Sequence, residues 1–188
     1  MNSPQATNIF FLLFAFSEIG LLLFKRAKGG ATSKDRGTLA ALWLGIGASI
    51  YAAIWVSHAF DQFWFCPTMV GYVFAVVLFL GGLGLRWWSI IHLGRFFTVN
   101  VAIAQDHRIV DDGPYRLLRH PSYTGALVAF CGLALMLSNW LSAIVLLVPI
   151  TTLFFWRISI EEKALSAAFG AAYEAYKART KRLIPFIY

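Results

Sequence analysis

The residues best suited to chemistry lie in one short stretch, Val110–Gly125, with the sequence VDDGPYRLLRHPSYTG. It holds two Asp, two Arg, one His and two Tyr between long apolar segments. Its GP pair predicts a turn, and Pro121 suits the first position of a helix. His120 and Tyr123 would then share one side of that helix's first turn, where free N–H groups also favour an anionic group. The stretch therefore predicts a site that holds a charged cofactor beside a lipophilic substrate.

The elements that must position this site are apolar. Of the 188 residues, 59% are hydrophobic and 13% charged, and the mean hydropathy is +0.67. These values are typical of a multi-pass membrane protein and exclude an ordinary soluble domain. Cys66 and Cys131 lack the spacing of metal ligands, so we expect no disulfide framework and no metal site.

The hydrophobic pattern predicts five membrane spans, at residues 8–24, 39–60, 70–91, 121–137 and 140–156. Pro149 is expected to bend the fifth. Beyond it, apolar residues at three-and-four spacing from Ile160 to Tyr176 predict an amphipathic helix, mildly interrupted at Gly170. This helix is expected either on the inner membrane surface or over the polar stretch Val110–Gly125. The expected fold is an all-α integral membrane protein with about five transmembrane helices plus a C-terminal amphipathic helix. Residues 1–188 form a single membrane domain, with three N-terminal spans in 1–91 and a cofactor-binding half in 92–188.

The basic residues predict the orientation of the chain. Lys and Arg follow the first, third and fifth spans, whereas residues 61–68 and 138–139 contain neither. The positive-inside rule then places the N-terminus outside and the C-terminus in the cytoplasm. The net charge of +7 also indicates attraction to anionic membrane lipids. It does not indicate nucleic-acid binding, because no basic face is interleaved with stacking aromatics.

Three features within the predicted spans have competing interpretations. Gly82 and Gly84 follow no strand, so they favour close helix packing over a nucleotide-binding loop. Glu18 is an intramembrane charge, and such charges usually face a cavity or a partner. Arg86 is a similar case. It either lines a site or extends its long side chain to the inner membrane surface.

The central motif resembles a known family. HRIVDDGPYRLLRHPSYTG, at residues 107–125, resembles the signature of the isoprenylcysteine carboxyl methyltransferase family. LGRFFT before it, and Arg157, Glu161-Glu162, FGAAYEAYKART and LIPF after it, follow in the order and spacing of that family. The resemblance begins near Gly84, and the first two spans carry no recognisable motif. Eukaryotic members have more spans before the shared half, so the chain looks like a compact prokaryotic relative in the inner membrane.

The resemblance implies an integral-membrane methyltransferase that uses S-adenosylmethionine and takes a lipophilic substrate from the bilayer. Glu161 or Glu162 can pair with the cofactor's ammonium, while His120 and Tyr123 can hydrogen-bond its carboxylate or ribose. Tyr115 can flank the adenine. The expected cofactor-binding residues are Val110, Tyr115, Leu118, Arg119, His120, Pro121, Tyr123 and Glu161. For Arg119, and equally for Arg116, the alternative is a cytosolic edge contacting lipid phosphates.

Arg157 and Glu162 are the expected catalytic residues. Methyl transfer to a carboxylate or thiolate needs no general base, but an anionic acceptor favours a nearby cation. Arg157 lies one helical turn before Glu161, so both can face one pocket. The alternative is a structural Arg157–Glu161 pair, and Glu162 can serve either the cofactor or the reaction.

The acceptor stays open at this point. It is expected to be a lipophilic small molecule or a lipidated group, methylated on a carboxylate, a thiol or an amine. Two other classes of function compete with methyl transfer. One is an NADPH-dependent membrane reductase of the sterol-reductase type. The other is a non-catalytic membrane module or transporter, although transporters often show repeated halves and this sequence shows none.

Overall fold

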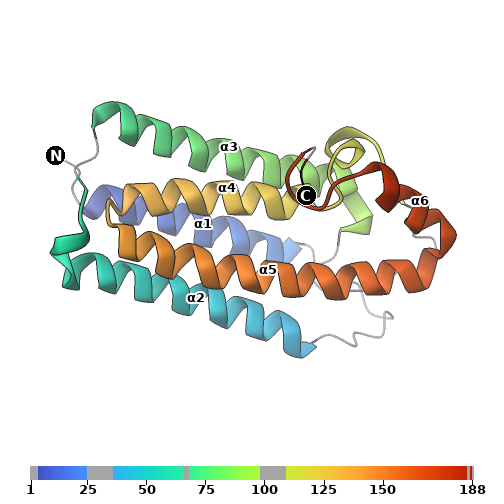
Figure 1. Cartoon of the computed structure of the whole chain (residues 1–188), viewed down its shortest axis with the longest axis horizontal. Coiled ribbons are helices and arrows are strands. Elements are labelled where there is room, and N and C mark those ends of the chain that lie inside the picture. Colours follow the sequence, from blue (N-terminus) through green and yellow to red (C-terminus); the bar gives the residue numbers. More distant parts are fainter. Residues whose placement is uncertain (1–3, 25–35, 66–67, 98–108, 186, 188) are drawn as a thin grey trace.

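Five long helices lie side by side along the long axis of the molecule (Figure 1). The structure is a computed structural model, and it describes residues 4–24, 36–65, 68–97, 109–185 and 187. Within these residues there are helices, turns and isolated bridges, but no β-strand. The helices are α1 (Pro4–Phe24), α2 (Arg36–Ala59), α3 (Met69–Leu93), α4 (Pro121–Met136), α5 (Trp140–Phe169) and the short α6 (Ala171–Arg179).

The predicted all-α membrane fold is confirmed. In the part of the chain that the structure describes, three helical segments are long and apolar enough to cross a membrane, namely Gly37–Ala59, Met69–Phe96 and Trp140–Phe169. Two shorter apolar helical segments, Thr7–Leu21 and Pro121–Met136, fall at the other two predicted spans. Many large apolar side chains point outward and stay exposed, as expected where lipid is the solvent.

The sequence predicts that the fifth span ends near residue 156 and that a separate amphipathic helix follows, and the structure contradicts this separation. Helix α5 continues without a break to Phe169, so it includes most of the segment predicted as a separate amphipathic helix. Pro149 lies inside α5, and strong helix formers make up most of its last part, from Glu161 to Phe169. The helix ends only at Gly170, whose φ of +51° is a conformation that favours glycine and whose N–H bonds to Ser166 O. Arg157 and Glu161 are therefore carried rigidly on a membrane helix.

Glycines bring α3 and α4 into direct backbone contact. A Cβ atom on Gly82 would lie 2.4 Å from Ala129 N, and one on Gly125 would lie 2.5 Å from Arg86 N. A Cβ on Gly84 would meet nothing within 4 Å. The predicted packing role is thus confirmed for Gly82 and wrong for Gly84. The close approach places Arg86 beside the first turns of α4, where the motif ends.

A pair of alanine substitutions tests this contact. We expect Gly82→Ala to destabilise the protein by about 1–3 kcal/mol, because the new methyl group collides with the α4 backbone. Gly84→Ala is the matched control and should be neutral or slightly stabilising, since alanine favours helix. The measurement is the midpoint of thermal unfolding of the detergent-solubilised variants. Equal midpoints for the two variants would contradict the packing.

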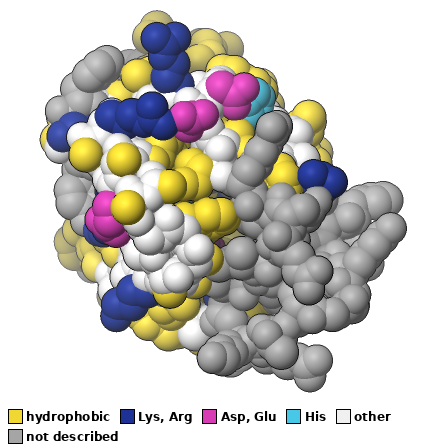
Figure 2. All heavy atoms as spheres, turned by 90° about the vertical axis from the view of Figure 1, so that its right-hand side faces the viewer, with side chains coloured by type: hydrophobic (Ala, Val, Ile, Leu, Met, Phe, Trp, Pro, Cys, Tyr) yellow, Lys and Arg dark blue, Asp and Glu magenta, His cyan; other side chains and the backbone are white. Residues whose placement is uncertain are grey.

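The two ends of the bundle differ in character. At one end, Asn139 links the loop between α4 and α5 to the loop that follows α2. Its Oδ1 accepts from Ser142 N at 3.0 Å, and its Nδ2 donates to Phe60 O at 2.9 Å. At the other end lie the motif, α6 and the C-terminal segment (Figure 1). Figure 2 shows basic side chains and several acidic ones gathered on this second end. The candidate site therefore lies where the apolar bundle meets a polar surface.

Candidate functional site

The C-terminal segment holds the motif in place. Arg119 N donates to Lys181 O at 2.7 Å, and Lys181 N donates to Leu117 O at 3.0 Å. Thr124 Oγ1 on the first turn of α4 donates to Leu183 O at 2.7 Å. Leu183 is itself buried against the body of the protein. Residues 117–124 and 181–183, about sixty positions apart, are thus hydrogen-bonded to each other at this end of the bundle.

Two tyrosines fix the turn that precedes α4. The hydroxyl of Tyr176 on α6 donates to Tyr115 O at 2.8 Å, and Tyr115 in turn donates to Ser89 O at 3.3 Å. Burial raises the pKa of Tyr115 and of Tyr176 above its ordinary value. Both phenols therefore stay neutral at physiological pH and keep the protons they donate.

Glu162 is the centre of a buried ion cluster. Its carboxylate accepts from Arg119 Nε at 2.9 Å, from Arg182 NH2 at 2.6 Å and from His120 Nε2 at 3.2 Å. Arg119 also donates to Thr180 O at 2.6 Å. Arg119 is thus bound within the protein, which does not fit its alternative as an edge residue on lipid phosphates. Glu162 joins α5 to the motif and the C-terminal segment.

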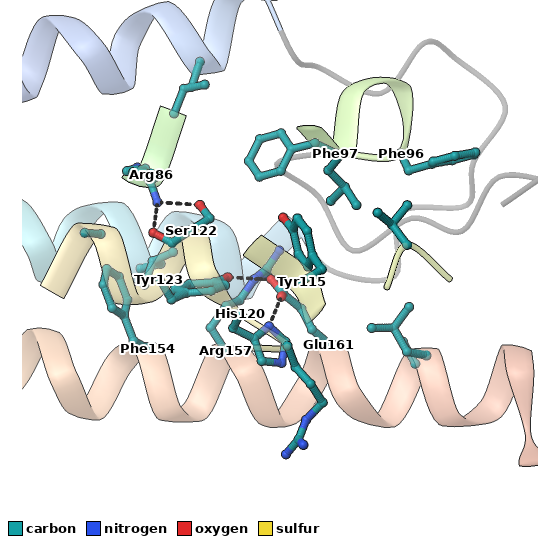
Figure 3. Close-up of a pocket in the computed structure, with 18 of the residues that line it drawn as sticks. Arg86, Phe96, Phe97, Tyr115, His120, Ser122, Tyr123, Phe154, Arg157 and Glu161 are labelled. Carbon is teal, nitrogen blue, oxygen red and sulfur yellow. Dashed lines mark hydrogen bonds and ion pairs between the residues drawn. The ribbon is translucent and has the colours of Figure 1, made fainter. Parts of the chain in front are cut away.

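Glu161, the neighbour of Glu162, faces a cavity (Figure 3). Its Oε1 accepts from Tyr123 OH at 2.5 Å and from Arg157 Nε at 3.3 Å. Its Oε2 lies 3.7 Å from His120 Nδ1, which is too far for a hydrogen bond. Arg157 is 1% exposed and donates through NH1 to Thr38 Oγ1 at 2.6 Å. His120 therefore lies between two glutamates, and Arg157 pairs with Glu161 while also facing the cavity.

A second ion pair lines the same cavity. Arg86 donates to both oxygens of Glu18, through Nε at 2.5 Å and NH2 at 2.6 Å. Its NH1 donates to the hydroxyl of Ser122 at 3.1 Å and to the Ser122 carbonyl at 3.3 Å (Figure 3). Both residues line this cavity, and the Arg86 guanidinium bonds to Glu18 and Ser122 instead of extending toward the membrane surface. The pair ties α1 and α3 to the first turn of α4.

The cavity has a volume of about 210 Å³ and joins two different surfaces. One surface comes from the motif, α5 and α6, and carries polar side chains such as His120 and Glu161 among aromatic and aliphatic ones. The other is apolar and comes mainly from α1 and α2, with Phe14, Leu21, Leu39, Leu42, Trp43 and Ile46. Such a wall suits a polar molecule at one end and a lipophilic one at the other.

Most of the predicted site residues line this cavity, but three do not. Those that do are Val110, Tyr115, Arg119, His120, Tyr123, Arg157 and Glu161. Leu118, Pro121 and Glu162 are buried outside the wall formed by the described residues. The contributions of α2 to the wall were missed, as was the contact of Thr38 with Arg157, because no motif distinguishes these residues from lipid-facing ones. Tyr173 and Tyr176 were placed only on an amphipathic face, although their three-residue spacing could have suggested a shared pocket.

Residues 74–167, half of the chain, match the model of the Isoprenylcysteine carboxyl methyltransferase (ICMT) family. The chain belongs to this family. Protein-S-isoprenylcysteine O-methyltransferase B of Arabidopsis thaliana is 37% identical to it over 133 residues, which are 60% of this chain and 68% of the relative. Methanethiol S-methyltransferase 1 of Bradyrhizobium diazoefficiens is 38% identical over 73 residues, which are 38% of this chain and 24% of that protein.

A solved structure has a similar fold. The eukaryotic intramembrane Ras methyltransferase ICMT matches with a TM-score of 0.58 and 26% identity, over 80% of this chain and 51% of that one. The chain thus spans between a quarter and about two thirds of the length of these three proteins. Membership of the ICMT family places the chain among membrane methyltransferases and implies a methyl donor. It does not favour the reductase and transporter interpretations.

Proposed function

We propose that this ICMT-family protein transfers a methyl group from S-adenosylmethionine to a lipophilic acceptor that enters from the bilayer. The observation that carries the proposal is the shared cavity. Its wall joins the His120–Glu161–Tyr123 cluster to the apolar side chains of α1 and α2. A polar cofactor and a lipid-soluble acceptor can therefore bind next to each other in this cavity.

The residues of the polar end fit this methyl donor. The donor carries an ammonium, a carboxylate and an adenine, and the wall offers a matching group for each. Glu161 Oε2 is not within hydrogen-bond distance of His120, so it can accept from the ammonium. His120 can hydrogen-bond the carboxylate or the ribose, and Tyr115 can flank the adenine beside Val110. When bound, the cofactor supplies an electrophilic methyl group on a sulfonium.

The protein's own contribution is alignment and charge. A carboxylate or thiolate acceptor is already nucleophilic at neutral pH, so the site must orient it and remove water from it. We assign Arg157 as the cation beside the acceptor, held by Glu161 and Thr38. We assign Glu162 a positioning role, because its contacts are with Arg119, His120 and Arg182 rather than with the cavity.

The apolar wall favours an acceptor with an alkyl or prenyl chain. The Arabidopsis relative is named for an isoprenylcysteine acceptor, and we propose a carboxylate on such a lipophilic thioether as the methylated group. A thiol is the second candidate, because the Bradyrhizobium relative is named for methanethiol. Incubating the purified protein with both acceptor types and locating the added methyl group distinguishes the two.

Binding of labelled S-adenosylmethionine to the detergent-purified protein tests the cofactor assignment. We expect saturable binding that unlabelled S-adenosylmethionine displaces and NADPH does not. Displacement by NADPH, or no saturable binding of the methyl donor, would overturn the proposal. The assay requires no knowledge of the acceptor.

We also propose that the polar end faces the cytoplasm, in the inner membrane of a prokaryotic cell. The positive-inside rule and the basic side chains on this end support the orientation (Figure 2). Reporter fusions at Gly30 and after Tyr188 should report the cytoplasm, and a fusion at Gln62 should report the outer side. A cytoplasmic result at Gln62 would contradict the orientation.

A further inference from the structure

Two buried hydrogen-bonding groups on the cavity wall have no partner among the residues that the structure describes. They are the indole Nε1 of Trp43 and the hydroxyl of Tyr173. Buried polar side chains are normally paired, and leaving one unpaired costs about 1–3 kcal/mol. Both residues lie outside the segment 74–167 that matches the family model. Each is therefore a candidate for a hydrogen bond that forms only when a ligand fills the cavity.

Tyr173 belongs to the polar end. It lies on α6, is 2% exposed, and burial raises the pKa of its phenol, so the hydroxyl keeps its proton. The neighbouring Tyr176 is on the same short helix and equally buried, yet its hydroxyl donates to Tyr115 O at 2.8 Å. An unpaired hydroxyl is thus not a general property of α6.

Trp43 belongs to the apolar end. It lies on α2, whose cavity-lining neighbours Leu39, Leu42 and Ile46 are aliphatic. Its indole N–H can donate but cannot accept a hydrogen bond. Two other indoles are paired, since Trp64 Nε1 donates to Ser57 O at 2.9 Å and Trp87 Nε1 donates to Ser17 Oγ at 2.7 Å. The Trp43 donor is therefore a polar point among the aliphatic side chains that α2 contributes to the described wall.

We propose that Tyr173 hydrogen-bonds the methyl donor and that Trp43 donates to an oxygen of the lipophilic acceptor. The assignment rests on the proposed function and follows the polarity of the wall. A charged cofactor fits the end that carries His120 and Glu161, and an acyl or prenyl chain fits the end formed by α2. The acceptor is accordingly a lipophilic molecule with a carboxylate or carbonyl oxygen beside its chain, rather than a simple alkyl thiol.

Tyrosine-to-phenylalanine variants test the first half. Tyr173→Phe removes a hydroxyl that has no partner in the described part of the chain, so thermal stability should be unchanged or higher. Its affinity for S-adenosylmethionine should fall about tenfold, the size of one buried hydrogen bond. Tyr176→Phe is the matched control and should lower the stability, because it breaks the bond to Tyr115 O. Unchanged cofactor affinity in Tyr173→Phe would overturn the assignment.

An isosteric replacement tests the second half. Site-specific incorporation of β-3-benzothienylalanine at position 43 replaces the indole N–H by sulfur and preserves the ring. The KM for an S-prenylated thioether acid should rise about tenfold, with kcat and S-adenosylmethionine affinity unchanged. The same replacement at Trp64, at the far end of the bundle, should leave the KM unchanged. An unaltered KM for the position-43 protein would overturn the role of Trp43.

Failure of this inference is distinguishable from failure of the proposed function. If the function is wrong, the unmodified protein neither binds S-adenosylmethionine nor methylates the acid. If only the inference is wrong, the unmodified protein does both. The Tyr173→Phe variant and the protein altered at Trp43 then have the same cofactor affinity and the same KM as the unmodified protein.

Discussion

Replacing Arg157 by alanine is expected to lower turnover by about a hundred- to a thousandfold, the loss seen when one charge-stabilising group is removed from an active site. Binding of S-adenosylmethionine should stay nearly unchanged. The reason is the place of the guanidinium, which lies on the cavity wall and is anchored to Thr38 on α2 as well as to Glu161. It therefore lies between Glu161, which is assigned to the cofactor, and helix α2, whose apolar side chains line the part of the cavity expected to hold the acceptor.

This variant needs a folding control, because Arg157 is 1% exposed and its removal leaves Glu161 without a cationic partner on α5. Breaking a buried ion pair in this way costs about 3–5 kcal/mol. Arg157→Lys retains the charge, so it should fold stably and recover part of the turnover. Calorimetry with the methyl donor and single-turnover rates are to be measured on both. If Arg157→Ala lost cofactor affinity as severely as His120→Ala, the assignment to the acceptor would be wrong.

The second large effect is expected at the polar end. Glu161→Gln should weaken S-adenosylmethionine binding by about ten- to a hundredfold, because a hydrogen bond to a charged group contributes about 1.5–3 kcal/mol. The amide oxygen can still accept from Tyr123 OH, so the fold should change little. His120→Ala should weaken the same binding, since His120 lies 3.7 Å from the Glu161 carboxylate on the cavity wall.

Glu174 provides the matched control for Glu161. It lies on α6 near the site, but its carboxylate is exposed and pairs with Ser166 and Lys177. Glu174→Gln should leave cofactor affinity unchanged, and isothermal titration of both variants gives the comparison. Equal cofactor affinity in Glu161→Gln and the unmodified protein would remove Glu161 from the cofactor site.

Local sequence chemistry was enough to locate the motif and its helix start. The turn at Gly113-Pro114 and the helix start at Pro121 both occur where the sequence predicted them. Each depends on residues adjacent in the chain. The continuation of α5 was missed because the change from a uniformly apolar to an amphipathic pattern marks a change of surroundings, not the end of a helix.

Partners distant in the chain could not be predicted. Glu18 and Arg86 were each recognised as unusual charges, but 68 residues separate them, and only the packing of α1 against the rest brings them together. The same holds for Thr38, which lies 119 residues before Arg157. Gly82 and Gly84 show that prediction is also limited within one helix. They are only two residues apart, but they lie on different faces of α3, and only Gly82 contacts α4.

Methyl transfer from labelled S-adenosylmethionine to two acceptors tests the central claim most directly. One acceptor is an S-prenylated thioether acid, and the other is its short, water-soluble analogue with the same carboxylate. The joined polar and apolar walls of the cavity predict that label accumulates in the prenylated acid and that its kcat/KM far exceeds that of the analogue. Equal turnover of the two, or no label in either, would contradict a cavity that binds a cofactor and a bilayer-derived acceptor together.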